Sequence, residues 1–147
     1  MGAILKCAAY FALTLLLAMV GGVSAQPDAD FNQALVESYD LLEAGKLDQA
    51  RALLERLAQK DPGNPLVLNN LGAIMVKQKK YQDAVWCLEQ ALPRARGYKV
   101  KVNRVCDLGG MCLAYRPLLD AYGDQDLEPL IRLNLDLIKA QMGADKQ

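Results

Sequence analysis

Three cysteines in the second half of the chain, Cys87, Cys106 and Cys112, have the clearest capacity for chemistry. Cys106 and Cys112 flank the turn-like residues 107–110, and a disulfide between them would contribute about 2.4 kcal/mol by restricting the unfolded chain. We predict this pairing, with Cys87 as a buried thiol in a helix. A bond from Cys87 to either of the other two cysteines is the alternative.

The same cysteines could instead serve a small exported thiol or redox enzyme. The chain has no C-x-x-C sequence and no histidine, so a thiolate lacks its usual activating groups and zinc or haem lacks a common ligand. Asp124, Asp126 and Glu128 supply only part of a calcium loop and are better explained as helix-capping residues. We therefore expect no catalytic residues, no metal and no cofactor.

The charges of the chain are balanced, with 17 basic and 17 acidic residues among 147. No block of like charge stands out, so a nucleic-acid partner is not expected. The candidate partner is a protein or a peptide.

Residues 65–92 contain two amphipathic helical patterns around a short polar turn at 78–80. Gly72 and Ala84 are small, as expected where two helices approach closely. The positions on the inner faces are Leu68, Leu71, Gly72, Met75 and Val76 in the first pattern, and Ala84, Val85, Leu88, Ala91 and Leu92 in the second.

A second copy of this pattern lies earlier in the chain, at a constant spacing. The positions equivalent to Met75, Val76, Tyr81, Ala84, Leu88 and Ala91 are Leu41, Leu42, Leu47, Ala50, Leu54 and Leu57, all apolar. Leu71 corresponds to Glu37, which is a mismatch. The chain resembles the tetratricopeptide repeat family over residues 29–92, with repeats at about 29–62 and 63–93. The resemblance implies an all-α fold of helical hairpins that binds proteins through a concave groove.

The groove positions implied by the resemblance come from the first helix of each repeat. Asn70 stands where peptide-binding members carry an asparagine that hydrogen-bonds the ligand backbone. Its side chain is expected to point away from the core, and Lys77 is expected to favour an acidic or C-terminal group. The candidate partner-binding residues are Tyr39, Glu43, Asn69, Asn70, Ala73 and Lys77, with Leu35 and Leu42 beside them.

Residues 1–25 resemble a signal peptide. Lys6 precedes an apolar run over 8–23, and Val23, Ser24 and Ala25 form a cleavage pattern. The run is shorter than the ~20 residues that a membrane span needs, although an uncleaved anchor is the alternative. We expect export to the periplasm or the medium, with membrane contact only through this segment if it is kept.

Local signals set the remaining boundaries. Gly45 predicts the end of a helix over 31–44, Asp48 caps the next, Asn64 and Pro65 begin the third, and Pro93 ends the fourth near Leu92.

Residues 94–116 form either a hairpin, with strands near 98–105 and 111–115, or an irregular loop. We expect this segment to cover Trp86; a binding anchor at Trp86 is the alternative. Residues 117–142 are expected to cap the stack with a short helix over 117–123 and a longer one after Asp126, buried on more than one face.

The sequence thus predicts an exported interaction or assembly module that acts through its groove. A scaffold that polymerises through exposed repeat ends is a further alternative.

Overall fold

The computed structural model describes residues 29–105, 113–118 and 126–144, which form five helices and one two-stranded antiparallel sheet. The predicted repeats thus appear as helices, and the predicted hairpin appears as two short strands. The elements are α2 (Ala29–Glu43), α3 (Leu47–Lys60), α4 (Pro65–Lys77), α5 (Tyr81–Ala95), β1 (Val102–Val105), β2 (Ala114–Pro117) and α6 (Leu127–Ala144).

The turns inside the two helical hairpins have the same backbone geometry at equivalent positions of the repeat. Gly45 and Lys79 both adopt a left-handed conformation, with φ of 74° and 57°. Lys46 N–H donates to Leu41 O at 2.9 Å, and in the second hairpin Lys80 N–H donates to Met75 O at 2.8 Å. Both helices therefore end with the same C-terminal motif, although only the first has glycine there.

Helix starts agree only partly with the capping signals. Asn64 Oδ1 accepts the N–H groups of Leu66 and Val67, both at 3.1 Å, so the cap of α4 is confirmed. The prediction that Asp48 caps α3 is wrong, because α3 begins at Leu47 after Lys46 and has no side-chain cap. Asp48 lies in the first turn instead, where its charge still favours the helix N-terminus.

Helix α5 continues through Pro93 to Ala95, so the prediction that it ends near Leu92 is wrong. Proline costs a helix one hydrogen bond and crowds the preceding turn. Ala91 and Ala95 are both fully buried on either side of it. Their packing holds the last turn in place.

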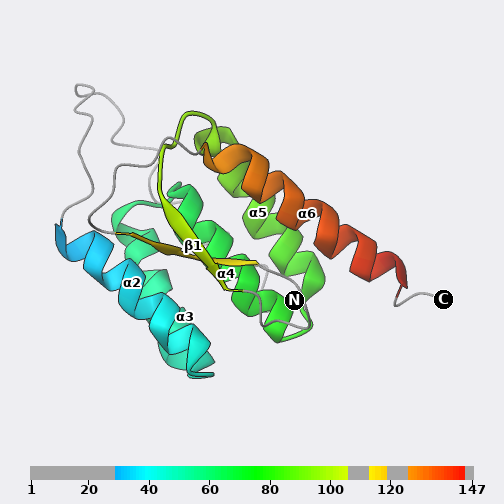
Figure 1. Ribbon diagram of the computed structural model, residues 1–147. Helices are drawn as coiled ribbons and strands as arrows, with labels where there is room; N and C mark the ends of the chain where they lie inside the picture. Colours follow the sequence, from blue (N-terminus) through cyan, green and yellow to red (C-terminus); the bar gives the residue numbers. More distant parts are fainter. Residues whose placement is uncertain (1–28, 106–112, 119–125, 145–147) are drawn as a thin grey trace.

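Figure 1 shows the helices side by side, with the β1–β2 ribbon lying across α2 and α4 and with α6 against α5. Among the described elements, α5 packs against α4 and α6. Trp86 is partly buried against the core, and because residues 106–112 lie outside the described residues, its cover by the 94–116 segment stays a prediction. Pro117 pairs with Val102, and Leu118 N–H donates to Lys101 O at 2.9 Å. A helix starting at Pro117 is therefore wrong, and the rest of that prediction falls outside the described residues.

Helix α4 is the centre of the core and is buried from Pro65 to Val76. It is in contact with each of the other four described helices and with β2, which explains why its apolar residues are not confined to one face. The close approach expected at Gly72 and Ala84 is confirmed, although it leaves room for a methyl group. A Cβ there would lie 3.5 Å from both Leu88 and the carbonyl oxygen of Ala84, which is ordinary contact.

Candidate functional site

The inner face of α2 and α4 is occupied by β2. Leu113, Ala114 and Tyr115 are at most 2% exposed. The Tyr115 hydroxyl donates to Leu130 O on α6 at 3.3 Å, so this segment touches helices at both ends of the fold. The chain therefore places its own extended segment where the sequence predicted a partner.

Asn70 binds the main chain of that segment at two atoms. Its Nδ2 donates to Tyr115 O at 2.9 Å, and its Oδ1 accepts Tyr115 N–H at 2.9 Å. This is the pair of bonds that a residue of a neighbouring strand would make. The Asn70 amide thus takes the place of a third strand along the edge of β2.

Two further asparagines donate hydrogen bonds to the carbonyl oxygen of Leu113. Asn69 Nδ2 donates to it at 2.7 Å, and Asn134 Nδ2 of α6 donates to it at 3.0 Å. Asn134 Nδ2 also donates to Asn69 Oδ1 at 2.9 Å, which links α6 to α4. All three asparagines are at most 1% exposed. We call Asn69, Asn70 and Asn134 the asparagine clamp.

The clamp bonds three backbone groups on the edge of this segment that faces away from β1: Tyr115 N–H, Tyr115 C=O and Leu113 C=O. In an antiparallel pair, alternate residues point their backbone groups to the same side, so those of Leu113 and Pro117 lie on the same edge as those of Tyr115. Pro117 has no N–H to leave unpaired there, which is why proline is tolerated on an edge. Because strand edges otherwise attract other chains, the clamp also protects β2 from pairing elsewhere.

An ion pair connects β2 to α2 at the surface. Arg116 Nε donates to Asp40 Oδ1 at 3.0 Å, and both side chains are partly exposed. The hydrogen bond from this guanidinium to Asp40 raises the pKa of Arg116 above its ordinary value. Exposed pairs of this kind are worth little energy, so Arg116 orients the strand more than it holds it.

The predicted partner-binding residues divide into two groups. Tyr39, Asn69, Asn70 and Ala73 are at most 1% exposed. The expectation that Asn70 points away from the core is wrong, because β2 covers it and uses both of its polar atoms.

Glu43 is exposed and Lys77 is half-buried, away from the clamp bonds. Whether any of the six predicted residues contacts a partner stays a prediction.

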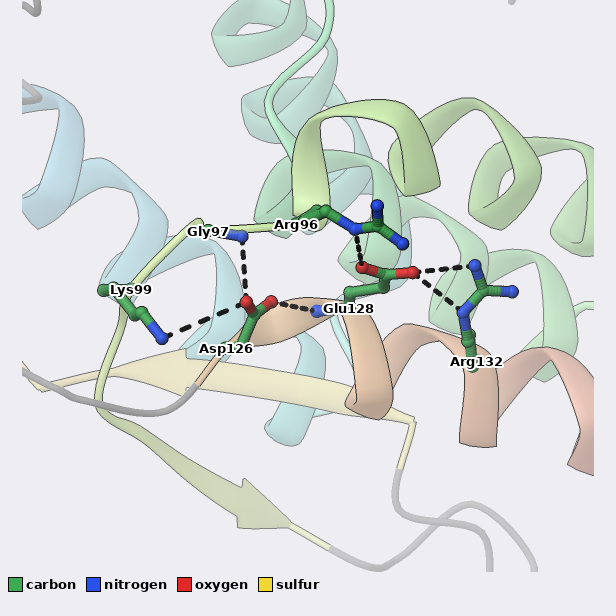
Figure 2. Close-up of polar contacts among 6 residues, drawn as sticks. All are labelled: Arg96, Gly97, Lys99, Asp126, Glu128 and Arg132. Atoms are coloured by element: carbon green, nitrogen blue, oxygen red, sulfur yellow. Dashed lines mark hydrogen bonds and ion pairs between the residues drawn. The ribbon is translucent and has the colours of Figure 1, made fainter.

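A second polar cluster, drawn in Figure 2, joins α6 to the end of α5. Asp126 caps α6 as predicted: its Oδ1 accepts Glu128 N–H at 3.0 Å, and its Oδ2 accepts Gly97 N–H at 2.9 Å. Glu128 accepts from Arg96 at 2.9 Å and from Arg132 at 2.7 Å. These bonds lower the pKa of both carboxyl groups below their ordinary values. The cluster therefore connects the start of α6 to the end of α5.

Asn134 was missed by reasoning from the sequence, and the fold brings it to Asn69 from 65 residues away. The available signal was a lone amide among the leucines of 127–138, since a buried polar side chain normally has a hydrogen-bond partner.

Cys87 is buried in α5, as predicted, whereas Cys106 and Cys112 lie outside the described residues, so their pairing is untested. Within the described ranges, no group of three or more histidine, cysteine or acidic residues could hold a metal ion. No helix described here has the length and apolar character needed to cross a membrane.

Residues 41–100 match the family model described as Tetratricopeptide repeat. The matched segment runs from the last turn of α2 to the approach to β1, and it supports the resemblance to a family that generally mediates protein–protein binding. No curated protein and no solved structure matches the chain.

Proposed function

We propose that this chain is a non-enzymatic protein-interaction module whose α2–α4 groove binds an extended segment by its main chain. In the free protein β2 fills that groove, and a partner segment binds by taking its place. The observation that carries the proposal is the pair of hydrogen bonds between the Asn70 amide and the N–H and C=O groups of Tyr115, both 2.9 Å long.

The clamp bonds main-chain N–H and C=O groups, and every residue except proline has both. The side chains of a ligand must therefore determine which segments bind. Leu113 and Tyr115 are two residues apart, and both side chains are buried. The next residue, Arg116, is partly exposed and donates to Asp40 of α2. A ligand that replaces β2 should therefore be extended, with large apolar side chains at alternate positions and a basic residue next to one of them.

Release of β2 sets the strength of partner binding. Exposing the Leu113 and Tyr115 side chains costs about 1.5–3 kcal/mol each, or about 3–6 kcal/mol together. This lowers the apparent affinity of a competing segment by about 10²- to 10⁴-fold. Only segments that fit the groove well would displace the strand, which gives selectivity at the expense of affinity.

Hydrogen exchange measured by NMR tests whether β2 can leave without unfolding of the helices. The Tyr115 amide should exchange through a local opening, faster than the core amides of α4 such as that of Met75. If the Tyr115 amide exchanges only as fast as the slowest core amides, β2 is a permanent part of the core and the proposal is wrong.

Peptide competition supplies the second test. An unlabelled peptide with the sequence of residues 113–118 should shift the Asn70 side-chain NH₂ resonances of the labelled chain and remove protection from its Tyr115 amide. The matched control is the same peptide methylated at the tyrosine nitrogen, which keeps every side chain but cannot donate to Asn70 Oδ1. Equal effects of both peptides, or none from either at millimolar concentration, would count against main-chain recognition.

Export is part of the same proposal. It is supported by the pattern of residues 1–25, in which a short apolar run precedes Val23, Ser24 and Ala25. The exported protein should begin at Gln26 in N-terminal sequencing. A chain that retains Met1 would point to the anchor alternative instead.

A further inference from the structure

Helix α6 is the last helix of the stack, and its outer face is not that of an ordinary end cap. Leu133 is 46% exposed and Leu137 is 36% exposed, and they are the exposed large hydrophobic residues of the described chain. The expectation that the leucines of this helix are buried on more than one face is therefore wrong at these two positions. End caps of repeat proteins normally need a polar outer face.

The two leucines belong to a longer stripe along α6. They are one turn apart, and the exposed residues Pro129, Ala140 and Ala144 continue the same side of the helix at spacings of seven or four residues. We call these five residues the outer stripe. It is narrow and nearly free of polar groups, like the contact seam of a helix pair.

A row of charges runs beside the outer stripe. Glu128, Arg132, Asp136 and Lys139 follow one another along α6 with alternating sign. Arg132 donates to Glu128 at 2.7 Å, and Lys139 lies 3.4 Å from Glu89 of α5. Asp136 has no ion-pair partner among the described residues. Read from the other end of the helix, the same row has the opposite sign at each position.

We infer that the outer stripe binds α6 of a second copy of this chain, with the two helices antiparallel. A two-fold axis between residues 134 and 135 places Leu133 against Leu137 of the second copy and Arg132 beside Asp136 of the second copy. Pro129 then faces Ala140, and the outer charges pair with opposite sign as well. A parallel copy would place like charges together, which disfavours it.

The contact is isologous, so it closes on itself and gives a dimer, not the polymer considered from the sequence. A single helix face is smaller than the surface of about 800 Å² per partner that a standard stable interface buries. We therefore expect a dissociation constant of roughly 1–100 µM. Dimerisation leaves the clamp untouched, so this inference is independent of the proposed function.

Sedimentation equilibrium of the purified, processed chain over a range of concentrations tests the dimer directly. The wild type should pass from monomer to dimer in the micromolar range, and Leu133→Glu should remain a monomer at every concentration. Ala52→Glu places the same charge on an exposed position of α3 and should dimerise like the wild type. Circular dichroism should show both variants folded. A wild type that is monomeric at 1 mM (about tenfold above the weakest expected affinity), or a Leu133→Glu variant that still dimerises, overturns the inference.

Charge reversal tests the antiparallel register. Asp136→Arg and Arg132→Asp should each weaken self-association about tenfold or more, because each turns two attractive pairs into repulsive ones. Mixed together, the two variants should recover dimers, since every pair across the axis is then attractive. Asp48→Arg makes the same change of charge on α3. Alone it should dimerise like the wild type, and with Arg132→Asp it should form fewer heterodimers than Asp136→Arg does, because one of the two pairs across the axis stays repulsive. A mixture no more dimeric than its components refutes the proposed register.

Discussion

Replacing Asn70 with alanine should destabilise the fold strongly, although the residue stands at a position predicted to face solvent. The substitution removes the two amide atoms that bond the Tyr115 N–H and C=O groups, each 2.9 Å away in a buried site. Each buried group left unpaired costs about 1–3 kcal/mol. One water in the space left by the side chain can restore part of this, so we expect a loss of about 2–4 kcal/mol.

Asn134→Ala provides a matched comparison inside the same clamp. Leu113 O would keep its bond from Asn69 at 2.7 Å, so only Asn69 Oδ1 loses its donor. The substitution also removes Asn134 Oδ1, a buried atom that has no hydrogen-bond partner among the described residues. We therefore expect a smaller loss, about 1 kcal/mol.

Urea unfolding followed by far-ultraviolet circular dichroism measures these free energies. Gln49→Ala, which removes an exposed amide from α3, should change stability by less than about 0.5 kcal/mol. The reasoning fails if Asn70→Ala is no more destabilising than Gln49→Ala, or if the order of Asn70→Ala and Asn134→Ala is reversed.

Three further substitutions or conditions have expected outcomes. Lys79→Gly should stabilise the chain by about 1 kcal/mol, because Lys79 has a positive φ of 57° that costs a residue with a side chain about 1–2 kcal/mol; a lower melting temperature would contradict this. Gly72→Ala should stabilise by about 0.4–1 kcal/mol, since a Cβ meets only ordinary contacts at 3.5 Å; destabilisation would mean that the helices cannot accept a methyl group. The pKa of Asp126 is lowered by hydrogen bonds from the backbone N–H groups of Glu128 and Gly97. The pKa of Glu128 is lowered by the hydrogen bond from Arg96. The two carboxylates therefore contribute their full stabilisation above the ordinary values of 3.8 and 4.5, and this stabilisation is lost as the pH falls through the lower folded values. In the double variant Asp126→Asn, Glu128→Gln, the free energy of unfolding should fall less steeply with acid than in the wild type. The same pH dependence in both proteins would refute this.

The sequence by itself predicted the features that depend on neighbouring residues. The cap at Asn64, the stop at Gly45 and the cap at Asp126 act through residues within four positions of each side chain, so their types alone indicate them. The repeat spacing was visible for a related reason. Each hairpin repeats the same local pattern of apolar and turn residues, as the paired turns at Gly45 and Lys79 show.

Only the tertiary structure decided which surfaces are covered. Asn70 reads as a groove residue until β2, 45 residues away in sequence, bonds to it and buries it. Leu133 and Leu137 read as core residues until α6 turns their side of the helix away from α5. Proline ends a helix by local rules, yet burial of Ala91 and Ala95 carries α5 past Pro93. In each case the free energy of burial comes from residues distant in sequence, and local patterns carry no information about them.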